Sequence, residues 1–599
     1  MELDQIVDWQ RTKFCGELRA GDIGQEHILM GWVNTRRDHG GVIFCDLRDY
    51  TGISQVVFAT QHDTESFQKA DKLRSEFVIA VRGIIAKRDE ETINPKMVTG
   101  EIELHVKELR ILNACSRLPF QISDEQQEVG EKTRLTYRTL DLRRPAMQQT
   151  MILRSKTAQV IRNFFFDNGF FEIETPVLTK STPEGARDFL VPSRVNPGKF
   201  YALPQSPQLF KQMLMVAGYD RYFQIVKCFR DEDLRGNRQP EFTQIDIELS
   251  FSNQDQIMEL TEQMIERLFK ETIDYEVHLP IQRMTYEEAV ETYGSDAPDL
   301  RFDLPLVDLS SVVQNCGFKV FSGAVKSGGI VKAIMVPGGD SLSRKDLDDL
   351  TEFVKIYRAK GLAYVKMKED GWQSPIAKFF SDEEIQEINR RTGAKAGDLI
   401  LFGADQKKVV HDSLGNLRKE LARRLGLIDN NEFRFVWITE FPLFDYDEEE
   451  KRFTSSHHPF TMPDEDDLKR WETDDPLKIK SLAFDLVLNG VELGGGSIRI
   501  HRKDIQDRVF RLLDLTLEET QQKFGFFVEA LEQGAPPHGG LAFGFDRIMM
   551  FLANTESIRD VIAFPKTQQA ACLLTDAPSE VDKTQLRELS IAVRKAPAS

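Results

Sequence analysis

Residues 228–242 read CFRDEDLRGNRQPEF, an apolar strand pattern that runs into an arginine-rich loop and returns through Pro240 to an aromatic residue. Arg230 and Glu232 lie two residues apart, so on a strand they would share one face. On such a face a guanidinium can grip a phosphate, while a carboxylate meets a base, an amine or a metal. Phe242 is placed either to stack on a nucleobase or to pack in a core. No Walker A loop occurs in the sequence, so phosphates would be held by side chains.

A second stretch, residues 484–499, reads FDLVLNGVELGGGSIR. Two apolar runs joined at Asn489-Gly490 predict a β-hairpin. Asp485 and Glu492 interrupt the apolar pattern, which favours either a structural ion pair or two carboxylates that hold Mg²⁺ against substrate phosphates. Consecutive glycines would let a ligand approach the backbone, and Arg499 follows them.

A third stretch, residues 539–551, reads GGLAFGFDRIMMF and predicts an apolar helix that begins after small residues. Asp546 and Arg547 fall in its first turn. A helix N-terminus attracts anions, and an arginine there strengthens the attraction. This stretch therefore predicts another phosphate contact.

Taken together, these stretches resemble motifs 2 and 3 of class II aminoacyl-tRNA synthetases, with motif 1 over the helix 151–168 and the strand ending at Pro176. Further strings, STPEGARD at 181–188, LPQSPQLFK at 203–211, FGAD at 402–405 and HHPF at 457–460, resemble bacterial-type aspartyl-tRNA synthetases along essentially the whole chain. The resemblance implies a multidomain α+β fold with an N-terminal OB-fold β-barrel. It also implies an antiparallel-sheet catalytic domain with helices and an inserted α/β domain of the GAD type.

The reaction implied by the resemblance has two steps. Aspartate attacks the α-phosphate of ATP, giving aspartyl-adenylate and pyrophosphate, and the aspartyl group then passes to the terminal adenosine of tRNA. By similarity, Arg230 holds the α-phosphate and the reacting carboxylate of aspartate, Arg547 holds the γ-phosphate and Phe242 stacks under adenine. The other expected ATP-site residues are Asp231, Glu232, Gln239, Glu492, Gly544, Phe545 and Asp546, and the expected Mg²⁺ ligands are Asp485 and Glu492.

For the amino acid, the family places Glu184, Gln208 and Asp246 near the α-ammonium, and Lys211, Arg499 and His457 around the side-chain carboxylate. Asparagine cannot neutralise the two cations, so such a site can discriminate by roughly 10⁴ without editing. His457 has a structural alternative beside His458, and residues 180–188 resemble a loop that closes over the substrate. The residues expected to be catalytic are Arg230, Arg547 and Glu184.

The first 113 residues predict a small β domain. Strand patterns occupy 27–38, 41–49, 53–59, 77–88 and 101–113, with a helical pattern over 64–75, which is the order of an OB-fold. The resemblance implies that this barrel binds the tRNA anticodon, with Phe44 stacking on a base. Phosphate and base-edge contacts are expected from Arg37, Gln55, Asn94 and Glu103.

Two positions in the barrel bear on which tRNA is charged. Family members restricted to tRNA-Asp tend to have Leu where this chain has His39. Members that also charge tRNA-Asn tend to have His there and Gly in a later loop, where this chain has Glu91. The two positions disagree. We favour dual charging and keep strict tRNA-Asp specificity as the alternative.

The composition is typical of a soluble protein with several domains. The chain has 599 residues, 41% hydrophobic and 29% charged, with a net charge of −18. It lacks a signal-peptide or membrane-helix pattern, and its six scattered cysteines have no disulfide or zinc spacing, so we expect a cytoplasmic protein. An acidic chain disfavours indiscriminate nucleic-acid binding and leaves selective binding through a few arginines and aromatic residues.

The expected domains are an anticodon-binding barrel (1–113), a polar linker (114–139), a catalytic domain in two parts (140–299 and 426–599, the latter with a C-terminal extension) and an insertion (300–425). A homodimer formed through motif 1 is a family expectation. Asparaginyl- and lysyl-tRNA synthetases are the nearest rivals, but they lack the Gly403-Ala404-Asp405 insertion. More remote alternatives are a tRNA-independent asparagine synthetase and a catalytically inactive tRNA-binding relative.

Overall fold

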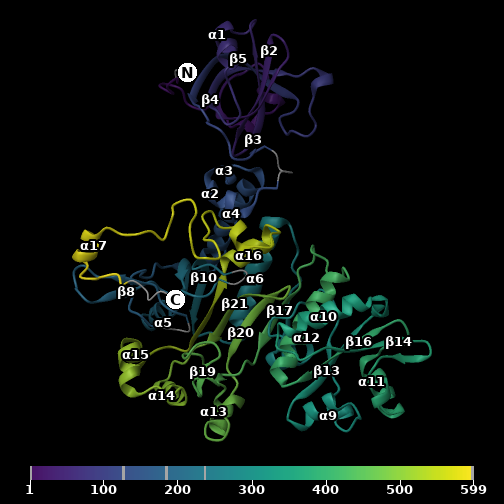
Figure 1. Ribbon diagram of the computed structural model, residues 1–599. Coiled ribbons are helices and arrows are strands. Elements are labelled where there is room, and N and C mark those ends of the chain that lie inside the picture. The colour runs from purple at the N-terminus through teal and green to yellow at the C-terminus, as the bar shows by residue number, and fades with distance from the viewer. Residues whose placement is uncertain (1–2, 124–127, 183–185, 235–237, 595–599) are drawn as a thin grey trace. The chain divides into compact units, whose positions relative to one another are not determined.

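The computed structural model describes residues 3–123, 128–182, 186–234 and 238–594 (Figure 1). The chain forms two compact units. One unit contains the residues up to Arg154 together with Arg559–Glu580, and the other contains Ser155–Ile558 together with the residues from Val581 onward.

The N-terminal unit begins with a closed barrel of strand order β1-β2-β3-β5-β4. Alternate residues of each strand point inward, and Ile43, Cys45 and Leu47 of β2 are fully buried in the barrel core. The helix between the third and fourth strands ends at Ala70 rather than Ser75, and Leu73 beyond it turns into the core. The predicted OB-fold is confirmed, with β1 at Glu26–Asp38, β2 at Val42–Asp49, β3 at Gly52–Ala59, α1 at Thr64–Ala70, β4 at Val78–Lys87 and β5 at Ile102–Asn113.

Two short helices, α2 (Glu131–Thr136) and α3 (Arg138–Asp141), follow the barrel. Arg138 is buried, pairs with Asp141 and donates to the carbonyls of Ala563 and Ile562. Residues 131–141 are therefore folded into the N-terminal unit, so the last part of the polar linker expected over 114–139 is helical. Helix α4 (Pro145–Asp167) comes next, confirming the helix predicted over 151–168, although it starts earlier.

The second unit is built on an eight-stranded sheet of order β11-β17-β20-β21-β22-β10-β9-β6. The six strands from β17 to β9 are antiparallel, while the edge strands β11 and β6 pair in parallel. This confirms the antiparallel catalytic sheet. The strands are β6 (Phe171–Glu172), β9 (Arg221–Phe229), β10 (Glu241–Ser250), β11 (Gln282–Thr285), β17 (Phe435–Thr439), β20 (Ala483–Leu488), β21 (Val491–Ile498) and β22 (His538–Gly544).

The edge strand β6 is shorter than the predicted strand that would end at Pro176. Its pairing with β9 is limited to Phe171 and Glu172, and Thr175 beyond them instead donates its hydroxyl to the Gln224 side chain. Helices and two small hairpins surround the sheet: α5 (Gln208–Val216), α6 (Gln254–Ile273), α7 (Tyr286–Tyr293), α13 (Glu465–Trp471), α14 (Lys503–Leu512), α15 (Leu517–Glu532), α16 (Phe545–Leu552), α17 (Lys583–Glu588), β7 (Leu190–Pro192) with β8 (Phe200–Ala202), and β18 (Phe444–Asp447) with β19 (Arg452–Ser455).

Between α7 and β17 the chain forms a separate sheet of order β12-β13-β16-β14-β15 (Figure 1). Both of its faces are covered, since one apolar cluster includes residues of α10 and α12 and another includes residues of α8, α9 and α11. Its elements are β12 (Leu306–Asp308), α8 (Ser310–Val313), α9 (Lys319–Lys326), β13 (Ile330–Val336), α10 (Arg344–Lys355), β14 (Ala363–Lys368), β15 (Gly371–Gln373), α11 (Asp382–Thr392), β16 (Leu399–Asp405) and α12 (Lys407–Arg424).

Candidate active site

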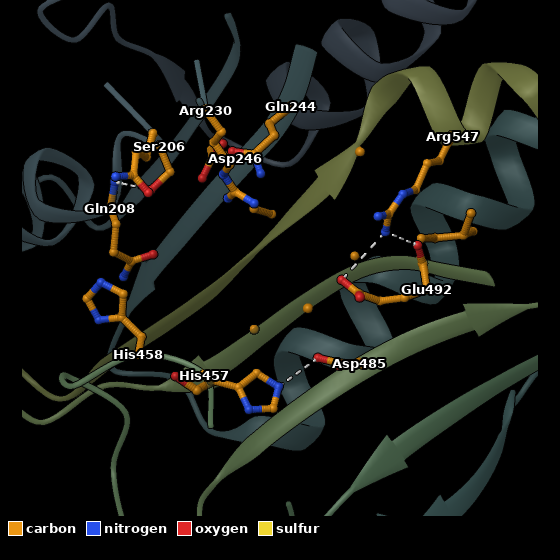
Figure 2. A pocket seen from close by; sticks show the side chains of 18 of the residues that line it. Ser206, Gln208, Arg230, Gln244, Asp246, His457, His458, Asp485, Glu492 and Arg547 are labelled. Carbon is orange, nitrogen blue, oxygen red and sulfur yellow. Dashed lines mark hydrogen bonds and ion pairs between the residues drawn. The ribbon is translucent and has the colours of Figure 1, made fainter. Parts of the chain in front are cut away.

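A cavity of about 560 Å³ lies on one face of the eight-stranded sheet, over β10, β21 and β22. Its lining draws on all three stretches identified in the sequence, including Arg230, Phe242, Asp485, Glu492 and Arg547. Figure 2 places Arg547 and Glu492 at one side of this cavity and Gln208 and His458 at the opposite side. The structure thus brings together residues that are more than 300 positions apart in the sequence.

Arg230 lies just beyond the end of β9, because the β9–β10 ladder stops at the pair Phe229 and Glu241. The expectation that Arg230 and Glu232 share the face of a strand is therefore wrong. The backbone amide of Arg230 donates to the carbonyl of Pro240 at 2.9 Å, and its guanidinium lies 5.2 Å from the centre of the Phe242 ring. Arg230 and Phe242 are stacked, leaving the guanidinium at the cavity wall.

Only some residues of the loop after Arg230 line the cavity. Glu232 and Gln239 line it, and Glu232 forms an ion pair of 2.7 Å with Arg238. Asp231 is not among the lining residues, and its carboxylate faces the Arg187 side chain at 3.6 Å.

Arg547 lies in the first turn of α16 and donates to the carbonyl of Glu492 at 2.6 Å. Asp546 accepts the backbone amide of Thr243 at 2.9 Å and so anchors the helix start to β10. Gly544 and Asp546 also line the cavity, whereas Phe545 is buried and is not part of the lining.

The predicted hairpin is confirmed, with Asn489 and Gly490 both at positive φ between β20 and β21. Asp485 on β20 lies over β21, where a Cβ added to Gly495 would be 2.2 Å from Asp485 Oδ1. This contact gives a steric reason for one of the consecutive glycines. His457 Nε2 lies 3.3 Å from Asp485 Oδ1.

Burial and neighbouring negative charge shift the pKa values of Glu492 and His457. Partial burial in the cavity and the carboxylate of Asp485 raise the pKa of Glu492. Burial opposes protonation of His457, but Asp485 outweighs it and raises the pKa of the imidazole.

Beneath the cavity lies a buried group of four charges formed by Lys211, Asp246, Glu248 and Arg499. Lys211 Nζ lies 3.0 Å from Asp246 Oδ1 and 3.4 Å from Glu248 Oε2. Arg499 holds both oxygens of Glu248, with Nε at 3.0 Å from Oε1 and Nη2 at 3.2 Å from Oε2. Two cations and two anions balance, which permits their burial.

Only part of this charged group opens to the cavity. Asp246 and Arg499 line it, whereas Lys211 is fully buried and is not among the lining residues, contrary to its expected place at a substrate carboxylate. Burial raises the pKa of Asp246 despite Lys211, while Arg499 and Lys211 outweigh burial and lower the pKa of Glu248. Glu248 was not predicted from the sequence, although its i+2 spacing from Asp246 on one strand is a usable signal.

At the far side of the cavity, Ser206 Oγ accepts the backbone amide of Gln208 at 3.3 Å. Within the described part of the chain, Gln208 Nε2 and Asp246 Oδ2 are buried atoms without a hydrogen-bond partner. These two atoms suit a ligand that carries both an acceptor and a donor, such as an amino acid. Glu184, expected near the same ligand, lies outside the described residues.

A polar stripe crosses the barrel on β1, β2, β3 and β5. Arg37 pairs with Phe44 across β1 and β2, and Arg37 Nη2 donates to Gln55 Oε1 at 3.2 Å. Gln55 Nε2 in turn donates to Glu103 Oε2 at 2.8 Å, and the His39 ring lies 5.6 Å from that of Phe44. Four predicted anticodon residues and His39 are thus neighbours. Asn94 is in a turn, where its Oδ1 accepts the amide of Lys96, and Glu91 is exposed on a short helical turn.

Comparisons with known proteins agree with this geometry. The family described as tRNA synthetases class II (D, K and N) matches residues 130–568, and the OB-fold nucleic acid binding domain matches residues 28–112. The fold and the site thus define a class II aminoacyl-tRNA synthetase. The chain is 58% identical over 590 residues to a protein of Syntrophotalea carbinolica named aspartate–tRNA(Asp/Asn) ligase, covering 98% of this chain and 99% of that protein.

A protein of the same name from Desulfatibacillum aliphaticivorans is 58% identical over 597 residues, covering 100% of both chains. The chain therefore belongs to the aspartate–tRNA ligase family. Among solved structures, asparaginyl-tRNA synthetase from Pyrococcus horikoshii, complexed with asparaginyl-adenylate, shares the fold with a TM-score of 0.58 and 20% identity, covering 93% of this chain and 98% of that one. No helix within the described ranges is both long and apolar enough to cross a membrane.

Proposed function

We propose that this chain activates L-aspartate with ATP and transfers the aspartyl group to both tRNA-Asp and tRNA-Asn. The observation that carries the proposal is that three of the arginines lining one cavity, Arg230, Arg499 and Arg547, have different surroundings. Arg230 lies on an aromatic ring, Arg547 lies at a helix start and Arg499 is paired with a buried carboxylate.

In this assignment, the adenine of ATP stacks on Phe242 and the α-phosphate meets Arg230. The γ-phosphate lies at Arg547, whose guanidinium is fixed by the carbonyl of Glu492. These contacts act by holding the carboxylate of aspartate in line with the α-phosphate and by neutralising charge that develops on it. Gln239 and Glu232 complete the walls around the nucleotide.

Mg²⁺ fits the pair Asp485 and Glu492. Burial and, after it, the neighbouring carboxylate of Asp485 raise the pKa of Glu492, and a divalent cation would relieve the repulsion between the two carboxylates. Since the described residues contain no cluster of three or more metal-ligating side chains, ATP phosphates and water would provide the remaining ligands. The ion would neutralise the departing pyrophosphate.

Aspartate would lie with its side-chain carboxylate toward Arg499 and His457, and with its ammonium toward Asp246 Oδ2 and Gln208. Lys211 would act from below by favouring the ionised forms of Asp246 and Glu248. Asparagine has no side-chain carboxylate, so it would not bring to Arg499 the additional negative charge that aspartate brings. Glu184 is proposed as a further residue that binds the ammonium.

The polar stripe of the barrel is proposed to bind the anticodon. Phe44 provides an aromatic face, while Arg37, Gln55 and Glu103 provide donors and acceptors in one connected row. Asn94 is proposed to add a contact from the neighbouring turn. The names of the relatives support dual charging, in agreement with His39 rather than with Glu91.

A homodimer is proposed through the end of α4 and β6. Phe166, Phe171, Val177 and Leu178 are 53%, 57%, 48% and 51% exposed in the single chain. Several large apolar side chains exposed so close together in the sequence are typical of an interface. The cytoplasm is the proposed location.

The test is ATP–pyrophosphate exchange by the pure protein with aspartate or with asparagine, and without tRNA. The proposal predicts exchange that depends on aspartate and is lost in Arg547→Gln. Lack of exchange with aspartate, or equal exchange with asparagine, would contradict it.

A further inference from the structure

We infer that Arg418 of the inserted domain is a positioning residue for the ATP site, acting through the segment 294–304 and the β20–β21 hairpin. The inference rests on the proposed function. It assigns the insertion a task in the reaction through a chain of contacts that begins in α12 and ends at the hairpin that carries Asp485 and Glu492.

The first contact is a set of hydrogen bonds from Arg418 to backbone carbonyls. Its side chain is fully buried, and its guanidinium donates to the carbonyls of Asp299 at 3.1 Å, Leu304 at 3.2 Å and Phe302 at 3.3 Å. The guanidinium also lies over the rings of Tyr293 and Phe302, at 4.8 and 4.4 Å from their centres. Burial lowers the pKa of Arg418 to about 10, so the group remains charged at neutral pH. Carbonyl dipoles and aromatic faces thus hold a buried cation in one place.

The second contact is a close approach of two backbones. Gly294 ends α7 at positive φ, and a Cβ added to Gly415 of α12 would lie 2.6 Å from the Gly294 carbonyl oxygen. A side chain at either position would separate α12 from α7. Helix α7 also begins at Tyr286, which lines the cavity, so the same helix touches the insertion at one end and the ATP site at the other.

The third contact joins the segment 294–304 to the β20–β21 hairpin. Asp299, whose carbonyl Arg418 holds, is buried, and a Cβ added to Gly490 would lie 3.0 Å from the Asp299 Cβ. Gly490 is in the turn between the strands of Asp485 and Glu492. Asp296, three positions before Asp299, lines the cavity directly. A shift of the segment would therefore move both a cavity wall and the turn of the hairpin.

The experiment compares Arg418→Met, Arg418→Lys and Gly415→Ala with Val365→Ala, a control that removes buried volume from the opposite face of the inserted sheet. Each variant is assayed for ATP binding by calorimetry without aspartate and for the KM of ATP in aspartate-dependent exchange. Arg418→Met and Gly415→Ala should weaken ATP binding and raise its KM about 10-fold while changing kcat much less. Arg418→Lys should retain part of the affinity, and Val365→Ala should bind ATP as the unaltered protein does.

Thermal unfolding establishes which variants are folded. If Arg418→Met is not folded, ATP binding by Gly415→Ala and Arg418→Lys tests the inference. Unaltered ATP binding in those variants of Arg418 and Gly415 that are folded would overturn the inference. An equal loss of ATP affinity in Val365→Ala would overturn it as well. Failure of the proposed function looks different, because exchange would then be missing from the unaltered protein as well.

Discussion

Arg499 and Glu248 form a buried bidentate ion pair between residues 251 positions apart, which is completed by Lys211. Gly540 makes room for it, since a Cβ there would lie 2.3 Å from Glu248 Oε2. Glu248 therefore lies against a cation that lines the cavity.

Replacing Glu248 by Gln should remove one of two buried anions and leave Lys211 and Arg499 with an uncompensated positive charge. We expect a loss of unfolding free energy of about 3 kcal/mol, measured by urea denaturation, and a higher KM for aspartate in pyrophosphate exchange. Glu387→Gln, in an exposed ion-pair group on α11, is the matched control and should leave both quantities unchanged. Similar stability losses in both variants would argue against a special role for the buried group.

The Gly495→Ala variant tests the placement of Asp485. The added methyl group would collide with Asp485 Oδ1, so the carboxylate must move from its present position next to Gly495. We expect the exchange rate to fall about 100-fold. Gly323→Ala, where the new methyl group meets no atom within 4 Å, should retain the rate of the unaltered protein. Normal exchange by Gly495→Ala would show that the position of Asp485 is not critical.

The packing of α7 against α12 should make the unfolding free energy sensitive to acid. His411 is buried near Glu291, Lys332, Lys407 and Asp308, and burial together with Lys332 lowers its pKa to about 4. Because the unfolded chain binds the proton more readily, the unfolding free energy should fall as the pH drops from about 6.5 to about 4, by on the order of 2 kcal/mol.

The measurement is urea denaturation of the unaltered protein and of His411→Gln across this pH range. Glu291, whose pKa is lowered to about 2, also loses its contribution in acid, but at lower pH. The difference between the two proteins should therefore change between pH 4 and 6.5. A constant difference would show that His411 does not titrate in the folded state as stated.

The barrel stripe is tested by Phe44→Ala. Loss of one base-stacking ring should weaken tRNA binding by about 1–3 kcal/mol. Exchange without tRNA should be unchanged, because the catalytic cavity lies on the eight-stranded sheet. A filter-binding assay gives the affinity, with Val320→Ala on the inserted domain as a control. Equal tRNA affinity in Phe44→Ala and the unaltered protein would remove Phe44 from the interface.

Local sequence patterns were sufficient for the barrel strands, helix α4 and the turn at Asn489-Gly490, because alternation, helical spacing and turn residues act over a few positions. They also identified Arg230, Phe242, Glu492 and Arg547, which do line one cavity. The prediction that Arg230 lies on a strand was wrong, because the position at which β9 stops pairing depends on its partner strand β10. The burial of Lys211 and the pairing of Glu248 with Arg499 depend on contacts between distant segments, which local spacing does not reveal.

Dual charging is tested by aspartylation of purified tRNA-Asp and tRNA-Asn with the same enzyme preparation. We predict aspartate-dependent charging of both tRNAs at comparable rates, and loss of both in Arg547→Gln. A preference of about 100-fold or more for tRNA-Asp, equivalent to about 2.7 kcal/mol, would contradict dual charging. Charging of neither tRNA would contradict the function itself.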